Sequence, residues 1–498
     1  MYCRIRISGH LDPSWQEWLN NLEVSREISG TTLLSGQLRD QAALYGVLLT
    51  IRRLGLPLLE LATSETPLHE ELVNRVDMYR RLVETLTHVL HARSTCNTTG
   101  KRTKRKTHRR KLSPMKIEPF KIAVPQATLD DLRARLAQTR WTDEIEGWNY
   151  GTNRAYLKEL VSYWQHEYDW RAQEAKLNQF AQFRTEIDGQ SIHFIHERGK
   201  GPNPTPIILV HGWPDSFYRF SKLIPRLTDP ASYGGDPAHS FDVIVPSLPG
   251  FGFSSRPGAG SMRSTRSAEV LARLMTEELG YQKYAAAGGD IGSRVTRLLA
   301  LAHPERLIGI HLTDIGFPRE MAFAPDVSNP TPGEERFLAA AGGWFMQEGG
   351  YAMIQSTKPQ TVTYGLNDSP VGLASWIVEK FRAWSDCDGD VEKRFSKDEL
   401  LTNIMIYWVT ETISSSARLY YEDVRTAPQL QAGQYIEVPA GVATFPKDLT
   451  VPPRELGERF LRVQRWTEMS RGGHFAALEE PDLLSVDIQQ FFSGLSPL

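Results

Sequence analysis

The sequence predicts an α/β protein with a mostly parallel sheet that is covered by helices on both faces, preceded by a separate small α/β unit. Three short apolar segments carry the prediction of strands: 206–210, 242–246 and 284–287. Helical segments lie between or after them: 217–228, 264–279 and 292–302. Buried strands that alternate with helices are typical of a parallel sheet with both faces covered.

Length and composition exclude several classes of protein. The chain has 498 residues, which at about 150 residues per domain predicts roughly three structural units rather than one small binding module. Its 41% hydrophobic and 23% charged residues are close to the average for globular proteins, so wholesale disorder is excluded. The formal net charge of −2 gives no support to a polyanionic partner. Three cysteines far apart form no CxxC pair, which argues against a disulfide framework or a zinc site.

The sequence offers no candidate for a membrane span. The most apolar stretch, 44–61, is interrupted by Arg52 and Arg53, and it is too polar to cross a bilayer unaided. Residues 1–9 lack the charged and then apolar order of a secretion signal. We therefore expect a soluble, cytoplasmic protein.

The sequence pattern of residues 1–63 predicts a small accessory α/β unit. Alternating apolar residues predict a strand at 3–7, and two further segments, 22–28 and 31–38, predict a hairpin around Gly30. Helices are expected at 13–19 and 40–53, followed by a last strand at 58–61. This part resembles short uncharacterised bacterial proteins and carries no catalytic constellation.

Residues 64–114 predict a helix, at 66–93, followed by a basic flexible linker. Eight lysines and arginines are packed into 101–111, where like charges repel and lack apolar partners. A nucleic-acid-binding arm is one interpretation of this run. A solvated tether between two fused modules is the other, and we favour it, so no nucleic-acid partner is expected.

From Met115 the chain is predicted to form a self-sufficient unit. Its first part, 115–205, contains expected helices at 127–139 and 155–168. A strand pair is predicted at 183–187 and 191–196, joined through a tight turn at Asp188-Gly189.

The first chemical motif is the sequence Gly288-Gly289-Asp290-Ile291-Gly292, placed between a strand and a helix. It has the form of the G-x-S-x-G nucleophile elbow, with Asp290 in place of serine. A carboxylate nucleophile suits displacement at a saturated carbon, which forms an ester of the enzyme's own side chain. Water must then attack the carbonyl of that ester.

Backbone donors and a base are expected around Asp290. The segment His211 to Pro214 follows an earlier strand, and in this architecture a residue at that position, here Trp213, supplies one backbone N–H of the oxyanion hole. The residue after the nucleophile, Ile291, supplies the other N–H. The general base is expected near the C-terminus after the last strand, and His474 in Gly472-Gly473-His474-Phe475 fits that position.

A carboxylate must orient the imidazole of this histidine. Asp448 is our choice, because it follows a predicted strand at 434–438 and the segment 441–445. Asp314, at the end of a predicted strand at 308–313, is the alternative, because it opens on the same edge of the sheet.

Several motifs in the same order resemble the microsomal-type epoxide hydrolases. They are the string from His211 to Pro214, the elbow 288–293, the segments 355–359 and 365–370, Tyr407-Trp408, and 472–475 with 479–481. The resemblance covers about Met115 to the C-terminus. It implies an α/β-hydrolase fold with an N-terminal region at 115–205, a core formed by 206–316 and 433–498, and a helical cap at 317–432.

The resemblance also implies two cap tyrosines that hold and protonate the epoxide oxygen. The matching positions are Tyr351 and Tyr420, with Tyr421 as the neighbouring alternative. The leaving alkoxide is too basic to depart unassisted, so O–H donors must meet its charge. Ile291 stands where the family often has tryptophan, which changes the expected wall of the pocket.

The implied function is hydrolysis of a small epoxide by water to a vicinal diol, with neither metal nor cofactor. A haloalkane dehalogenase-like hydrolase is the rival among enzymes, and a catalytically silent interaction protein with a hydrolase fold is the rival from another class. The intact set of Asp290, Asp448 and His474 argues against the silent scaffold. A homodimer is left open.

Overall fold

The computed structural model forms two compact units, Met1–Arg110 and Lys111–Leu498. It describes residues 2–12, 15–16, 19, 22–27, 30–39, 43–44, 47, 51, 58–64, 117–143, 145–316, 329–425 and 434–495. The expected helices at 13–19 and 40–53 lie largely outside the described residues. The helix at 66–93 and the basic linker lie wholly outside them.

The N-terminal unit contains a four-stranded antiparallel sheet in the order β2-β3-β1-β4. Its strands are β1 (Tyr2–Ser8), β2 (Glu23–Arg26), β3 (Thr31–Gln37) and β4 (Leu58–Ser64). Every second residue of β1 is buried, including Ile5 and Ile7, as the alternation of apolar residues predicts. The predicted strand at 3–7, the hairpin and the strand at 58–61 are confirmed.

The larger unit is built on a nine-stranded sheet in the order β13-β12-β11-β10-β8-β9-β7-β6-β5. Its strands are β5 (Glu118–Phe120), β6 (Gln182–Ile187), β7 (Gln190–Glu197), β8 (Thr205–Val210), β9 (Phe241–Pro246), β10 (Tyr284–Gly288), β11 (Leu307–Leu312), β12 (Ile436–Thr444) and β13 (Leu461–Glu468). Pairing is parallel from β13 to β9 and antiparallel from β9 to β5. The predicted, mostly parallel sheet is confirmed.

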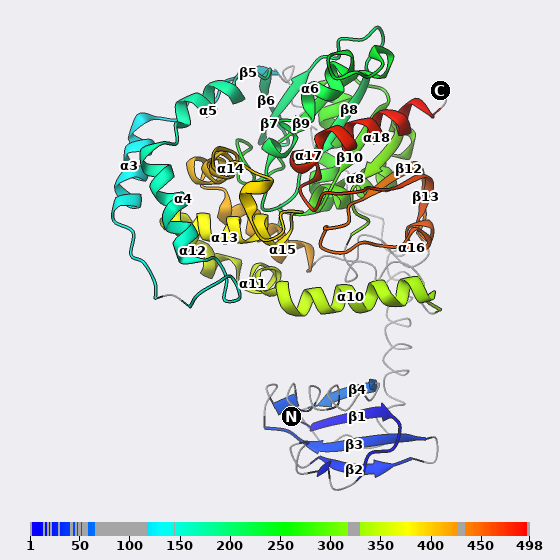
Figure 1. Ribbon diagram of the computed structural model, residues 1–498. Helices are drawn as coiled ribbons and strands as arrows, with labels where there is room; N and C mark the ends of the chain where they lie inside the picture. The colour runs from blue at the N-terminus through cyan, green and yellow to red at the C-terminus, as the bar shows by residue number, and fades with distance from the viewer. Residues whose placement is uncertain are drawn as a thin grey trace, which may run out of the picture. The chain divides into compact units, whose positions relative to one another are not determined.

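Several helices of the large unit pack on this sheet, whereas its first helices lie beside the group of helices described in the next paragraph (Figure 1). They are α3 (Gln126–Ala137), α4 (Arg154–His166), α5 (Trp170–Leu177), α6 (Ile224–Thr228), α7 (Ser264–Arg273), α8 (Ile291–Ala302), α16 (Arg454–Glu458), α17 (Ala476–Glu479) and α18 (Pro481–Ser493). Helix α8 contacts four central strands, and α18 contacts β11 and β12. In the part of the chain that the structure describes, every helix is too short or too polar to span a bilayer.

Six further helices form one group between β11 and β12 in the chain, shown in lime to gold in Figure 1. They are α10 (Pro332–Glu348), α11 (Gly350–Thr357), α12 (Pro359–Asp368), α13 (Pro370–Ala383), α14 (Lys397–Thr410) and α15 (Ile413–Asp423). Successive helices from α10 to α14 pack on one another, and α11 and α12 also pack on α15. This group, called the cap below, is an insertion in the sheet-forming chain.

One local prediction is wrong, one strand is longer than predicted, and one strand was missed. The segment 217–228 is not one helix but a 3₁₀ turn at Phe217–Phe220 followed by α6, because Pro225 has no N–H to continue a helical ladder. The expected strand at 434–438 and the segment 441–445 form one strand, β12. Strand β13 was not predicted, because its charged residues, typical of an edge position, break the apolar pattern.

A close approach between α8 and β8 fixes the geometry on which the site is built. Gly292 is in the first turn of α8, and a Cβ at this position would overlap the carbonyl oxygen of Val210. Both partners are backbone atoms in buried elements, so neither can yield without moving a strand or a helix. Glycine at position 292 therefore lets the helix begin directly against the sheet.

We predict that Gly292→Ala lowers the free energy of unfolding by about 2–4 kcal/mol, because the added methyl group overpacks a backbone contact. Chemical denaturation measures this change. The matched control is Gly365→Ala in α12, where an added Cβ meets nothing within 4 Å. This control should gain about 0.5–1 kcal/mol from helix propensity. Equal effects of the two substitutions would contradict the packing argument.

Candidate active site

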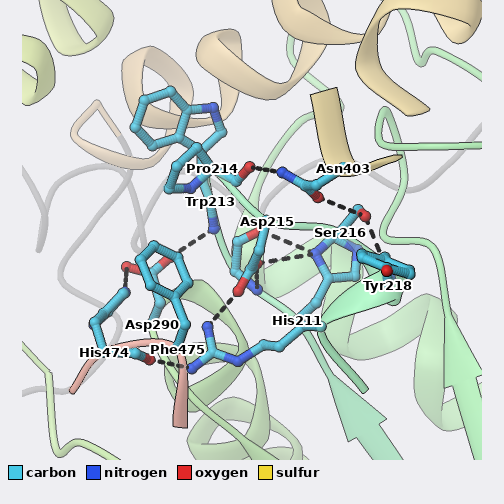
Figure 2. Close-up of polar contacts among 12 residues, drawn as sticks. His211, Trp213, Pro214, Asp215, Ser216, Tyr218, Asp290, Asn403, His474 and Phe475 are labelled. Carbon is cyan, nitrogen blue, oxygen red and sulfur yellow. Dashed lines mark hydrogen bonds and ion pairs between the residues drawn. The ribbon is translucent and has the colours of Figure 1, made fainter. Parts of the chain in front are cut away.

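Asp290 lies in the turn between β10 and α8, where the G-x-D-x-G pattern predicts the nucleophile. Its φ is 59°, in the left-handed region that residues other than glycine rarely adopt. The backbone N–H of Asp290 donates to Oδ2 of Asp314 at 2.6 Å, which stabilises this conformation. The turn places the carboxylate beside Trp213, after the end of β8 (Figure 2).

Backbone N–H groups meet this carboxylate. The Trp213 N–H donates to Oδ1 of Asp290 at 2.9 Å. A Cβ on Gly212 would overlap the same carboxylate, so this approach requires glycine at position 212. The backbone N–H of Ile291 also acts on the Asp290 carboxyl and lowers its pKa. The two predicted oxyanion donors are thus both close to the carboxyl group of Asp290.

His474 lies between two carboxylates. Its Nδ1 is 2.7 Å from Oδ1 of Asp448, and its Nε2 is 3.6 Å from Oδ2 of Asp290. The second distance is too long for a hydrogen bond, and Nε2 has no hydrogen-bond partner among the described residues. The imidazole is therefore oriented by Asp448 and directs its other nitrogen toward Asp290.

Mutual attraction sets the charges of this group. Burial lowers the pKa of His474, but the Asp448 and Asp290 carboxylates outweigh burial and raise this pKa to about 10. Burial raises the pKa of Asp290, yet His474 and the nearby backbone N–H groups hold it below its usual range. At neutral pH the group is a carboxylate, imidazolium and carboxylate in a row.

Asp314 lies on the other side of the turn. Its Oδ2 accepts the Asp290 N–H, and its Oδ1 accepts the Gly316 N–H at 2.9 Å. Burial and the Asp448 carboxylate raise the pKa of Asp314 to about 6. Among the described contacts, none joins Asp314 to His474, so of the two candidate acids Asp448 is the one in contact with the histidine.

The two cap tyrosines meet over Trp213. The Tyr351 ring, on α11, stacks on the indole with centroids 5.2 Å apart, and the Tyr420 ring, on α15, packs edge-on at 5.9 Å. Burial is the largest cause that raises the pKa values of both hydroxyls well above their ordinary value, and the Asp290 carboxylate adds to it. Both hydroxyls therefore remain hydrogen-bond donors at neutral pH. Tyr421 is 37% exposed and stacks under Arg425, away from this cluster.

The structure adds polar residues that sequence reasoning did not identify. Asn403, on α14, donates its Nδ2–H to the Pro214 carbonyl at 2.9 Å and accepts from the Ser216 hydroxyl at 3.0 Å (Figure 2). The Tyr407 hydroxyl donates to the Asp215 carbonyl at 2.7 Å. The cap therefore fixes the loop that carries Trp213. Sequence reasoning gave these side chains no role, although Asp215 and Ser216 directly follow the predicted oxyanion segment and Tyr407 belongs to one of the motifs that carry the resemblance.

A buried ion pair connects that loop to the histidine. Arg219 donates through Nη1 to Oδ2 of Asp215 and through Nη2 to the His474 carbonyl at 2.6 Å. Oδ1 of Asp215 accepts the Gly212 N–H at 2.9 Å. Both side chains are almost completely buried. The guanidinium thus joins the oxyanion loop and the histidine loop in one network.

The histidine loop is also attached to the end of α13. The His474 N–H donates to the Trp384 carbonyl at 2.8 Å, and the Gly472 N–H donates to Oδ2 of Asp386 at 2.9 Å. Chemically, the site combines a buried carboxylate with two N–H donors, a histidine–carboxylate pair and two phenolic donors. This arrangement can form and then hydrolyse an ester of Asp290.

Comparisons with known proteins agree with this chemistry. Residues 117–220 match the family model for the epoxide hydrolase N terminus, and 205–365 match the model for the alpha/beta hydrolase fold. Residues 2–62 match a domain of unknown function.

Relatives cover most of the larger unit. A Stigmatella aurantiaca protein with the provisional name epoxide hydrolase is 45% identical over 76% of this chain and 85% of its own. Epoxide hydrolase 1 of Sus scrofa is 39% identical over 76% of this chain and 89% of its own. The structure of Aspergillus niger epoxide hydrolase is 31% identical, covers 77% of this chain and 97% of its own, and has a TM-score of 0.66. The chain therefore belongs to the epoxide hydrolase family.

Proposed function

We propose that this chain hydrolyses small epoxides to vicinal diols through an ester formed on Asp290. One observation carries the proposal: the buried Asp290 carboxylate is bound at Oδ1 by the Trp213 N–H, and Nε2 of His474 is 3.6 Å from Oδ2. A nucleophile and a base are thus side by side in a site that is closed by the cap. The family membership supports the same reaction.

In the first step, Asp290 attacks one carbon of the epoxide ring and the C–O bond at that carbon breaks. The negative charge develops on the ring oxygen, which must accept a proton. Tyr351 and Tyr420 are the donors, because their hydroxyls lie over the same indole and remain protonated at neutral pH. A hydroxyalkyl ester of Asp290 results.

In the second step, water attacks the carbonyl carbon of this ester. Esterification removes the negative charge of Asp290, which is one of the two carboxylates that raise the pKa of His474. The pKa of His474 therefore falls after the first step, so the imidazolium gives up its proton, which restores the tyrosine hydroxyl that was deprotonated in ring opening, and the neutral imidazole acts as the base for water. The Trp213 and Ile291 N–H groups bind the oxyanion, and Asp448 stabilises the imidazolium that forms. The ester C–O bond then breaks, the departing diol oxygen takes the imidazolium proton, and the Asp290 carboxyl returns its own proton to the imidazole.

We also assign roles to parts of the chain. Residues 115–205 with the core, 206–316 and 433–498, form the hydrolase, and 317–432 form the cap that supplies both tyrosines. Tyrosine hydroxyls match an epoxide oxygen that needs a proton, and this favours an epoxide over a halide leaving group. The unit at 1–63 supplies no residue of the proposed site.

We predict that His474→Gln slows ring opening, because the imidazolium no longer faces the Asp290 carboxylate, but slows ester hydrolysis far more, at least about a thousandfold. Asp290 attacks the epoxide without the help of a base, whereas water needs a base to attack the ester. Mass spectrometry of the peptide that contains Asp290 should show an adduct with the mass of the epoxide. The control is the double variant His474→Gln/Asp290→Asn, which should form none. Diol production by His474→Gln at the wild-type rate would contradict the assignment.

The pH dependence of stability tests the charges of the group. The folded pKa of His474, about 10, lies above its unfolded value of about 6.5. A raised pKa stabilises the fold fully below the unfolded value, and this stabilisation is lost as pH rises toward 10. We therefore predict that wild type loses more free energy of unfolding between pH 7 and pH 10 than His474→Gln does. Urea denaturation across this range measures it, and parallel pH profiles would contradict the prediction.

A further inference from the structure

Helix α11 has an inverted pattern of burial. Met353 and Ile354 are 47% and 41% exposed, whereas Gln355 is 0% exposed. Folding ordinarily buries the apolar residues of a helix and leaves an amide in water. The orientation of α11 is therefore not explained by burial of its apolar side chains.

The amide of Gln355 is buried without partners. Neither Oε1 nor Nε2 forms a hydrogen bond with any described residue. A glutamine amide offers two donor hydrogens and two acceptor lone pairs, and burying them unpaired costs free energy. Most buried polar groups are paired, so an amide with neither end satisfied requires an explanation, and a ligand with a donor and an acceptor would provide one.

The position of Gln355 relates it to the proposed site. It follows Tyr351 by four residues on α11, so the two side chains lie on the same face, with Cβ atoms about 5–6 Å apart. That face is turned to the site, because the Tyr351 ring stacks on Trp213. Helix α11 also packs on α15, which carries Tyr420.

We propose that Gln355 binds a hydroxyl group that the substrate carries on the carbon next to the epoxide ring. This inference rests on the proposed function, in which Tyr351 binds the ring oxygen. In such a substrate the hydroxyl oxygen and the ring oxygen are closer together than one turn of an α-helix, which rises about 5.4 Å. Tyr351 and Gln355, which are one turn apart, can therefore bind the two oxygens together. The Gln355 Nε2–H donates to this hydroxyl oxygen, and Oε1 accepts its hydrogen, so both ends of the amide are satisfied. The substrate class is a 2,3-epoxy alcohol.

Two substrates that differ in one group test the proposal: trans-2,3-epoxyhexan-1-ol and trans-3,4-epoxyheptane, in which a methyl group replaces the hydroxyl. The ratio of their kcat/KM values is measured for wild type and for Gln355→Met, which keeps the side-chain length and removes the amide. Wild type is expected to prefer the alcohol. The ratio should fall about tenfold or more in Gln355→Met, which corresponds to the loss of one buried hydrogen-bonding site.

Thermal unfolding separates binding from a structural role. Gln355→Met should be at least as stable as wild type, because it removes an unpaired buried amide. The matched control is Gln182→Met. Gln182 is also buried, but its Nε2–H donates to the Leu177 carbonyl at 2.8 Å and its Oε1 is 2.9 Å from Nε2 of His193. This control should lose stability and keep the wild-type ratio.

The outcomes distinguish this inference from the proposed function. Turnover of neither epoxide by wild type would contradict the proposed function itself. Turnover with the same ratio in wild type and Gln355→Met would overturn only the role of Gln355. Equal falls in both kcat/KM values, together with lost stability, would also overturn it, because that is the pattern of a structural residue.

Discussion

The site depends on keeping one carboxylate ionised where water is largely excluded. An unpaired buried charge is costly, and the usual response is protonation, which would abolish the nucleophilicity of Asp290. The protein compensates the charge locally: the Trp213 N–H binds Oδ1, and the His474 imidazolium faces Oδ2. These donors reach the carboxylate only because glycines at 212 and 292 let a strand end, a turn and a helix start lie in contact. The fold around β8, β10 and α8 is therefore the means by which the charge is stabilised.

The segments that carry the reacting groups are tied to each other as well as to the sheet. Arg219 joins the oxyanion loop to the histidine loop through Asp215 and the His474 carbonyl. On the cap side, Asp423 accepts hydrogen bonds from the N–H and the hydroxyl of Ser264, which attaches α15, and with it Tyr420, to the core. Such cross-links fix distances between groups that are far apart in the chain. A reaction in two steps needs this rigidity, because the same carboxyl group must meet first the epoxide and then water.

Chain order and local pattern were sufficient to predict the elbow, the loops that carry Asp290 and His474, and the sheet except for its two edge strands, β5 and β13. They could not decide between Asp448 and Asp314, because both follow neighbouring strands and only the distance of 2.7 Å to the imidazole separates them. Tyr420 and Tyr421 likewise differ by the face of α15 that they occupy. The Asp215–Arg219 pair gave no signal, since charged residues are ordinarily exposed and their burial here depends on partners 255 residues away. What escaped prediction is thus mainly the long-range polar contacts of buried side chains.

The central claim is that water attacks the ester of Asp290 and not the epoxide. A single turnover of excess enzyme with styrene oxide in water enriched in heavy oxygen tests it directly, with mass analysis of the diol and of the peptide that contains Asp290. The account predicts that the label enters the Asp290 carboxyl group and that the first diol is unlabelled, because its new oxygen comes from the side chain. Label in the diol and none in Asp290 would show direct attack by water and would contradict the account.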